Sequence, residues 1–529
     1  MTQPAPVDGS ILVEKLLSPG AYPHAASAPV RLVETHISRV YLTGEFAYKV
    51  KKPIRLAFLD YSTLERRRAF CEEEVRLNRR LAPDLYLGVS PIAGTATAPR
   101  VDGAGHAIEY AVKMRQFDRR LELDALVAAD GVDAAEVAVL GARIARFHAA
   151  AGRVDPGSPF GRPEVVQRVT LANFEELGRL PEAVASEGRP SELEQWIAGE
   201  YQRTRDLMQS RRDSGRVREC HGDLHCGNVV RWAGELTPFD GIEFDPALRF
   251  VDVASDLAFL TMDLAVRGRD DLRHAALQAW AESLGDFQAC RLLPYFETYR
   301  ALVRAKVAAL RALQHPSGNA ERSRHCEDVL RYLDWASART RRARPAMLLT
   351  CGYSGSGKTC LARALATELG ALHLRSDVER KRIAGLGPLD DSRSPADGGI
   401  YTPQFTSRTY QRLHDCAADV LCGGDDVIVD AAFLKRDERE RMLALADRLD
   451  VRAAILHCVA PMEVLRERVT RRSQAGADAS EAGTATLLRQ PGFWESLGEA
   501  EIERTVTVDT NAPDAAAACR EALRGRGIR

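Results

Sequence analysis

Residues 347–369 read MLLTCGYSGSGKTCLARALATEL: an apolar run, a glycine-rich turn that ends in Gly-Lys-Thr, and a segment with leucines at helical spacing. This order is typical of a phosphate-binding P-loop between a buried strand and a helix. In such a loop the backbone N–H groups point at phosphate oxygens, and the helix N-terminus adds partial positive charge. The stretch therefore predicts a nucleotide site on an α/β domain.

The side chains of this loop have separate predicted roles. We expect Lys358 to reach the outer phosphates of a nucleotide and the Thr359 hydroxyl to hold magnesium. The glycines let the backbone approach the phosphates closely. The predicted nucleotide-binding residues of the loop are Gly352, Gly355, Ser356, Gly357, Lys358 and Thr359.

The chain after the loop alternates between apolar strands and helical patterns, which predicts a parallel sheet covered by helices on both faces. A basic run that ends in Pro345 precedes the first strand and predicts a boundary between two domains, residues 1–340 and 345–529. The predicted strands are 347–350, 371–374, 427–429 and 453–458, and the predicted helices are 358–369, 410–421, 436–449, 462–472 and 514–523.

Charged residues near the ends of these strands are candidates for the chemistry. Asp430 ends an apolar strand, so we expect it to hold magnesium together with Thr359. After the second strand, Asp377 could accept the proton of a hydroxyl group, and Arg380 could hold charge on the substrate. The alternative for Asp430 is an ordinary turn residue at the end of a strand. The alternative for Asp377 and Arg380 is a solvated charge at the start of a helix.

Arg468 and Arg472 lie four residues apart on one face of a predicted helix, ahead of a loop at 475–483. Arginines on a mobile lid stabilise the charge that spreads over a phosphate during its transfer. We therefore predict catalytic roles for both arginines, with a solvated helix as the alternative.

The P-loop, residues 376–381, residues 427–434 with Arg439, and the arginine pair together resemble the small P-loop kinases related to polynucleotide kinases, zeta toxins and gluconate kinases. The resemblance extends from Pro345 to the end of the chain. It implies an ATP-dependent kinase of a hydroxyl group, and it does not select the hydroxyl.

Residues 221–228 read HGDLHCGN, a second phosphotransfer motif in the first half of the chain. A kinase catalytic loop requires an aspartate that is followed five residues later by an asparagine. Asp223 would accept the proton of the acceptor, and Asn228 would bind magnesium. Asp240 would hold the metal between the phosphates, and we expect His221 to brace the loop through hydrogen bonds.

The remaining parts of this site must come from the residues before the motif. Lys49, on a predicted strand, is the candidate to pair with the phosphates, and Glu74 on the following helix could fix the lysine side chain. A solvated surface charge is the alternative for each. Other candidates are Lys51 and Lys52 for the lysine, and Glu72 and Glu73 for the glutamate.

The HGDLHCGN motif, Phe239-Asp240 and residues 252–258 resemble the aminoglycoside phosphotransferase and choline kinase group, over about residues 30–333. The resemblance implies a bilobal protein-kinase-like fold of α+β type, and it makes Asp256 a structural residue that opens or caps a helix. The two-part layout resembles bacterial bifunctional proteins that join such a domain to a P-loop kinase domain.

The first lobe departs from that family in one respect. Residues 35–43 lack the glycine-rich loop that usually covers the phosphates, so Ser38 and backbone amides would have to substitute for it. Alternating residues predict a small sheet covered by a helix. The predicted strands are 38–42, 46–50 and 108–114, the covering helix is 63–81, and further helices are predicted at 133–148, 192–212, 272–284 and 292–313.

The composition gives no support to several classes of protein. Seventy-three basic against 74 acidic residues give a net charge of -1, so no global field favours nucleic acid or membranes. Eleven scattered cysteines without a CxxC pair indicate reduced thiols, and no run of 18 apolar residues occurs. We expect a cytoplasmic protein without a membrane span. The sequence does not indicate the oligomeric state.

These observations predict a bifunctional enzyme that uses ATP and Mg²⁺, each domain transferring the γ-phosphoryl group to a hydroxyl of a small molecule. Two alternatives stay open. The C-terminal domain could phosphorylate the 5′ ends of RNA or DNA, or one domain could be a nucleotide-binding regulatory module that controls the other.

Overall fold

The computed structural model describes residues 9–56, 59–178, 189–316, 318–341, 344–395, 398–475 and 478–528. The chain divides into two compact units, Met1–Val169 with Arg205–Arg267, and Thr170–Thr204 with Gly268–Arg529. The predicted boundary between residues 340 and 345 lies inside the second unit and stays a prediction.

The first unit contains a six-stranded antiparallel sheet in the order β1-β2-β3-β8-β6-β7. Helix α2 (Leu64–Asn78) packs on it, because Cys71 and Val75 share a core with strands β3, β6 and β8. Thr63 caps the helix by accepting a hydrogen bond from Arg66 N. The strands are β1 (Arg31–Glu34), β2 (Ser38–Leu42), β3 (Phe46–Lys51), β6 (Tyr86–Thr95), β7 (Ala98–Val101) and β8 (Ala107–Arg115), with a short hairpin of β4 (Arg55–Leu56) and β5 (Leu59–Asp60).

This sheet confirms the strand pair predicted from the alternating residues. The turn between β2 and β3 contains Gly44, whose φ of 103° is costly for any residue with a Cβ. The covering helix is also confirmed, although it is three residues shorter at its C-terminal end than predicted.

In the same unit, the HGDLHCGN motif lies between two short strands, each of which pairs with another short strand. In the β10/β11 hairpin Val229 pairs with Pro238, and Phe239 N donates to Asn228 O (2.9 Å) just beyond it. The two chain segments that hold the predicted metal ligands therefore meet at the open end of this hairpin. The elements are α3 (Leu123–Ala128), α4 (Ala134–Ala150), β9 (Val217–Glu219), β10 (Val229–Trp232), β11 (Glu235–Pro238), α8 (Pro246–Arg249), β12 (Phe250–Asp252) and the buried α9 (Val253–Val266).

The second unit contains a five-stranded parallel sheet in the order β14-β15-β13-β16-β17. Every residue of β13 and β15 is buried, as expected for strands covered on both faces. The strands are β13 (Ala346–Cys351), β14 (Leu372–Arg375), β15 (Val427–Asp430), β16 (Arg452–Val459) and β17 (Thr505–Asp509).

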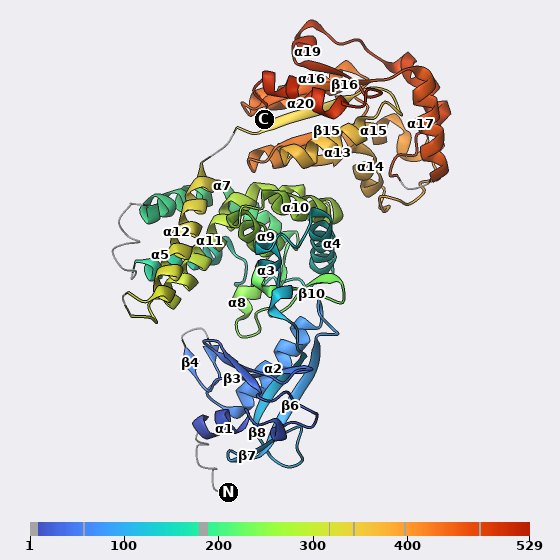
Figure 1. Cartoon of the computed structure of the whole chain (residues 1–529). Coiled ribbons are helices and arrows are strands. Elements are labelled where there is room, and N and C mark those ends of the chain that lie inside the picture. The colour runs from blue at the N-terminus through green and yellow to red at the C-terminus, as the bar shows by residue number, and fades with distance from the viewer. Residues whose placement is uncertain are drawn as a thin grey trace. The chain divides into compact units, whose positions relative to one another are not determined.

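Helices cover both faces of this sheet (Figure 1). On one face α13 and α20 bury Leu361, Leu365 and Leu523 against Leu348 and Ile428. On the other face α15 packs on β13, β14 and β15, and α16 packs on β16. The helices are α13 (Lys358–Leu369), α14 (Ser376–Ile383), α15 (Pro403–Cys422), α16 (Arg436–Arg448), α17 (Met462–Ala475), α18 (Thr484–Arg489), α19 (Glu499–Glu503) and α20 (Ala515–Gly525).

The helices that precede this sheet follow the predicted pattern closely. The predicted segments at 272–284 and 292–313 are α10 and α11, and α5 has no counterpart among the predicted helices. The helices are α5 (Pro163–Leu177), α7 (Arg189–Asp213), α10 (Asp270–Leu284), α11 (Leu293–Ala312) and α12 (Ala320–Thr340), with the short turn η4 (Phe287–Leu292). In the described part of the chain, no helix combines the length and the apolar character needed to cross a bilayer.

Candidate active sites

The P-loop joins β13 to α13, and its glycines are required by close contacts. A Cβ on Gly352 would lie 2.5 Å from Cys458 O, and one on Gly357 would lie 2.9 Å from the Thr510 side chain. Lys358 Nζ donates to Gly352 O (2.9 Å) and Tyr353 O (2.7 Å). The loop therefore closes around its lysine at the start of α13.

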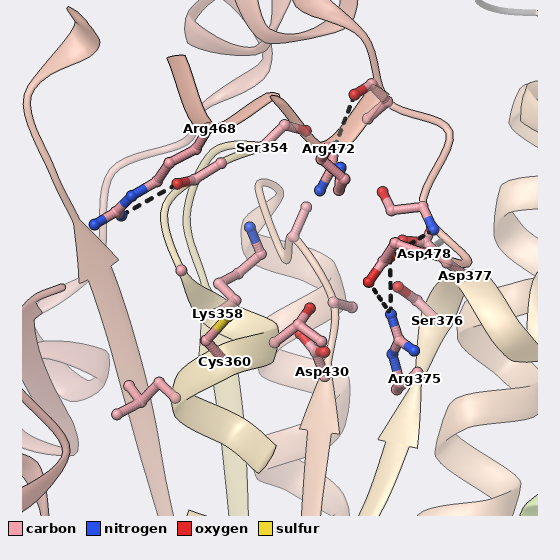
Figure 2. Close-up of a pocket in the computed structure, with 18 of the residues that line it drawn as sticks. Ser354, Lys358, Cys360, Arg375, Ser376, Asp377, Asp430, Arg468, Arg472 and Asp478 are labelled. Atoms are coloured by element: carbon pink, nitrogen blue, oxygen red, sulfur yellow. Dashed lines mark hydrogen bonds and ion pairs between the residues drawn. The ribbon is translucent and has the colours of Figure 1, made fainter. Parts of the chain in front are cut away.

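Lys358, Thr359 and Asp430 line one cavity of about 700 Å³. Figure 2 shows Lys358 and Asp430 among the residues that line it. Burial lowers the pKa of Lys358 from its ordinary value, although Asp430 and Asp377 oppose that shift. A buried ammonium facing a cavity attracts an anion, because the surroundings provide little solvation. This is the property that a phosphate-binding lysine needs.

Asp430 lies at the C-terminal end of β15 and accepts hydrogen bonds from several neighbours. Its partners include Thr350 Oγ1 (3.2 Å), His373 Nε2 (3.1 Å) and the Thr359 hydroxyl. Burial opposes ionisation of this carboxyl, but His373 and Thr359 outweigh it and lower its pKa to about 2. An ionised carboxylate beside a threonine hydroxyl is an oxygen donor set that suits Mg²⁺, so both residues could hold this ion. His373 was not predicted from the sequence.

Asp377 and Arg380, the residues predicted to face the acceptor, both lie on α14 and line the cavity. Arg380 is only 7% exposed, and its Nη1 donates to Ile400 O (2.8 Å) and Thr406 Oγ1 (3.1 Å). Its guanidinium lies 5.2 Å from the centre of the Tyr401 ring. Among the described residues, no carboxylate lies within 4.0 Å of this guanidinium, so the cation faces the cavity without an acidic partner.

The two predicted lid arginines line the same cavity but have different neighbours. Arg468 donates to Thr510 Oγ1 and O (both 3.0 Å), and Thr510 in turn donates to Ser356 O of the P-loop (2.8 Å). Arg472 donates to Ala482 O (2.7 Å). Arg468 is therefore attached to the nucleotide loop, whereas Arg472 is attached to the segment after α17.

Ion pairs connect the segment after α17 to the end of β14 and to α14. Arg375, at the end of β14, pairs with Asp478 (3.0 Å), and Lys381 pairs with Glu481 (3.0 Å). The first of these pairs is visible at the edge of the cavity in Figure 2. The predicted loop at 475–483 is described except for residues 476 and 477, which lie outside the described residues.

Arg439, which contributes to the P-loop kinase resemblance, has a structural environment. It is fully buried and donates to Glu501 Oε1 (2.6 Å), Phe433 O (3.0 Å) and Glu495 O (3.0 Å). It fixes the segment that follows β15 and does not line the cavity.

In the first unit, Lys49 lies between two carboxylates. Its Nζ is 2.5 Å from Asp240 Oδ1 and 2.9 Å from Glu74 Oε1. Burial alone would lower the pKa of Lys49, but Asp240 and Glu74 outweigh it and raise the pKa well above its ordinary value. The structure therefore brings together the lysine, the helix glutamate and the metal-site aspartate that the sequence predicted.

Lys51, the second lysine that the strand offered for this role, is also buried against Glu74. Its Nζ is 2.7 Å from Glu74 Oε2 and also contacts Glu243. Burial opposes ionisation of Glu74, but the two lysines lower its pKa to about 2. The neighbouring charged residues lie outside this cluster: Lys52 donates to Thr35 O, Glu72 pairs with Arg68, and Glu73 pairs with Arg76 and Arg249.

Asp223 and Asn228 contact each other directly. Asn228 Nδ2 donates to Asp223 Oδ2 and to Asp223 O (both 2.9 Å). Asp240 follows the hairpin with a left-handed φ of 61°, and His221 Nε2 lies 2.9 Å from Phe239 O. An amide oxygen and a carboxylate at the open end of one hairpin suit Mg²⁺, so Asn228 and Asp240 could hold it.

Two structural expectations for this unit concern Asp256 and Ser38. Asp256 accepts hydrogen bonds from His221 N (3.1 Å) and Gly222 N (2.7 Å), so it fixes the loop from the first turn of α9, and Asp252 is the residue that caps that helix. Ser38 is fully buried and presents no hydroxyl to a ligand, so its side chain does not substitute for a glycine-rich loop, and the suggested role of backbone amides stays a prediction.

A family model described as an AAA domain matches residues 347–495. The chain is similar to a putative kinase from Chloroflexus aurantiacus (26% identity, covering 35% of this chain and 96% of that one, TM-score 0.28). It is also similar to a choline/ethanolamine kinase family protein from Mesorhizobium loti (12% identity, 63% and 100% covered, TM-score 0.36).

The chain is 30% identical over 479 residues to an uncharacterized protein of Mycobacterium tuberculosis strain H37Rv, Rv2004c. The match covers 90% of this chain and 93% of that protein, so it includes both units described above. The chain belongs to the same family as this mycobacterial protein.

Proposed function

We propose that the chain is a bifunctional, magnesium-dependent phosphotransferase, in which each site transfers the γ-phosphoryl group of ATP to a hydroxyl of a small molecule. The observation that carries the proposal is the convergence of Lys358, Thr359 and Asp430 in one cavity. The arrangement of Lys49 and Asp240 supports the same chemistry in the first unit.

In the P-loop site the residues have complementary roles. Bound magnesium supplies positive charge to the phosphate oxygens. Asp377 accepts the hydroxyl proton as the acceptor oxygen bonds to the γ-phosphorus, and the bond from that phosphorus to the bridging oxygen breaks to leave ADP. Lys358 and Arg472 stabilise the charge on the transferring phosphoryl oxygens.

The acceptor of the P-loop site carries an anionic group near its hydroxyl. Arg380 is buried, faces the cavity and has no carboxylate within 4.0 Å among the described residues. A buried cation without a counter-ion is costly, so a ligand that supplies the negative charge binds favourably. Phosphorylated or carboxylated alcohols meet this requirement, and so does an oligonucleotide with a free 5′ hydroxyl.

In the first unit, Asp223 accepts the acceptor proton and the Asn228 side chain fixes its carboxylate. Lys49 binds phosphate oxygens, and Glu74 holds the lysine in place. Asn228 and Asp240 would hold magnesium, which supplies the charge that the phosphates require.

The test incubates the full chain with labelled ATP and a polar cell extract, and identifies labelled products by mass spectrometry. Asp223→Ala should remove one set of products and Lys358→Ala the other. Asp206→Ala and Lys435→Ala replace exposed residues of the same types and serve as controls. Unchanged labelling in both site variants would refute the two-site proposal.

The same variants separate catalysis from regulation. If the first unit is a regulatory module, Asp223→Ala will keep ATP binding and the protein will keep every labelled product. If it is a catalyst, the variant will keep ATP binding and lose its own products. For the P-loop site, 5′-hydroxyl oligonucleotides and small phosphorylated alcohols are compared as acceptors, and salt-sensitive phosphorylation of the former favours a nucleic acid kinase.

A further inference from the structure

Strand β14 lies at the edge of the P-loop sheet, so one side of its backbone has no strand partner. Gln278 of α10 occupies that side. Its amide oxygen accepts from His373 N (2.8 Å), and its amide nitrogen donates to His373 O (3.1 Å). The glutamine thus makes the two hydrogen bonds that another strand would make with residue 373, and Glu282 Oε2 accepts from the same amide nitrogen (3.0 Å).

His373 connects this contact to the candidate metal site. Its backbone binds Gln278, while its ring Nε2 lies 3.1 Å from Asp430 Oδ2. His373 is 7% exposed, and Asp430 is 5% exposed. A shift of the strand at residue 373 would therefore move the ring that orients the Asp430 carboxylate, because close-packed surroundings leave little room for compensation.

The last turn of α10 and the residue that follows it also contact α14 and α15. Arg382 of α14 donates to Glu282 O, and Arg412 of α15 donates to Gly285 O (2.7 Å). Both arginines pair with the buried Glu379 of α14 (3.0 Å each). The helix that carries the predicted proton acceptor is thus fixed by carbonyl groups from outside the P-loop sheet and its covering helices.

A buried ion cluster fixes the start of β15, the strand that ends at Asp430. Arg273 of α10 donates to Asp425 (3.1 Å) and to Glu297 of α11 (3.0 Å), and Arg339 of α12 donates to Glu297 (2.7 Å). Burial opposes ionisation of Asp425, but Arg273 and Arg339 hold its pKa below the ordinary value. The start of β15 is therefore attached to α10 through Asp425 and Arg273.

We propose that Gln278 is a positioning residue for the P-loop site, which it serves by fixing strand β14 and, through His373, the Asp430 carboxylate. The proposal rests on the function proposed above for that site. It means that the P-loop kinase includes α10, although this helix precedes the predicted boundary at residue 340. A chain beginning at residue 345 would lack this support.

The test uses the full chain in an Asp240→Asn background, so that the P-loop site dominates magnesium-dependent binding of a fluorescent ATP analogue. Gln278→Met keeps the side-chain length and removes both hydrogen-bonding groups. Gln411→Met is the matched control, because Gln411 is exposed on α15 and bonds only to Asp415 among the described residues. Hydrogen exchange of the 371–376 peptide is measured without metal as a second readout.

Gln278→Met should raise the Mg²⁺ concentration for half-maximal binding by about fivefold, since loss of a ligand's supporting group typically costs about 10- to 100-fold and Gln278 acts one residue further out. The His373 amide should exchange at least about tenfold faster in the metal-free protein. Gln411→Met should change neither quantity.

Faster exchange with an unchanged magnesium midpoint would show that Gln278 is only structural and would overturn the proposal, as would no change in either readout. A general loss of folding would lower the binding amplitude and leave the midpoint in place. If Lys358→Ala in the same background kept full magnesium-dependent binding, the proposed function would fail at this site, a result distinct from failure of the Gln278 proposal.

Discussion

Replacing Lys51 by Met should destabilise the first unit strongly while leaving the predicted phosphate lysine in place. The Lys51 side chain is fully buried and contacts two carboxylates, Glu74 and Glu243, which are 0% and 4% exposed. Methionine fills a similar volume but leaves both carboxylates short of a partner. Lys49 retains its contact with Glu74 Oε1.

The magnitude follows from the burial. Removing one partner of a buried ion pair typically costs about 3–5 kcal/mol, because the remaining charge is desolvated and uncompensated. A unit of this size loses roughly 3 °C of Tm per kcal/mol, which gives a decrease of about 12 °C. Lys52→Met is the matched control. The Lys52 side chain is 19% exposed and contacts Thr35 O and the exposed Glu34, so its loss should cost about 1 kcal/mol or less.

The assay is differential scanning calorimetry of the full chain, with hydrogen exchange of α2 peptides to assign the transition to the first unit. Lys49→Met should cost less stability, because its partner Asp240 is 40% exposed, but it should abolish turnover at that site. Lys51→Met combined with Glu243→Met should recover part of the loss, since the pair is then removed together. A melting point for Lys51→Met equal to that of Lys52→Met would refute this reasoning.

Three further outcomes are expected. Asp377→Asn should lower kcat of the P-loop site by about 10²–10⁴-fold with little change in ATP binding, and a rate within about twofold of wild type would exclude Asp377 as the proton acceptor. Arg375→Ala removes the partner of Asp478 and should raise the KM for the acceptor more than it lowers kcat, as steady-state kinetics can show. Burial, assisted by Asp437, raises the pKa of Glu438 from 4.5 to about 7. The folded state therefore binds this proton more tightly, and stability falls as pH rises from about 4.5 to 7. Glu438→Gln should therefore increase the free energy of unfolding by up to about 3 kcal/mol more at pH 8 than at pH 4. Thermal unfolding at both pH values measures this difference, and an equal increase at both would contradict the prediction.

Much of the architecture was predictable because its signals are local. The P-loop is one continuous segment, and α13 has the same bounds as the predicted helix. Strands β13, β15 and β16 are apolar runs, and each of their ends lies within one residue of the predicted position. Strand β17 was not predicted, although its Thr505–Asp509 segment alternates threonine and valine, because the segment is short and lacks the continuous apolar run of the other predicted strands of this sheet.

Within the sites, the sequence identified residues whose roles follow from motif spacing and missed those that depend on contacts between distant segments. It named Asp430 but not His373, since a histidine inside a short strand has no distinguishing spacing. It named Lys49 but could not exclude Lys51, because both lie on the same face of β3 and only the fold shows that each reaches a different oxygen of Glu74.

The sequence by itself determined the P-loop motif, the two sets of predicted catalytic side chains and the alternation that makes a parallel sheet, because each depends on neighbours within a few residues or on simple periodicity. Only the tertiary structure decided that Gln278 completes the edge of β14 and that Arg380 is buried without a carboxylate among the described residues. Burial and pairing of charges are properties of segments far apart in the chain, and no local pattern records them.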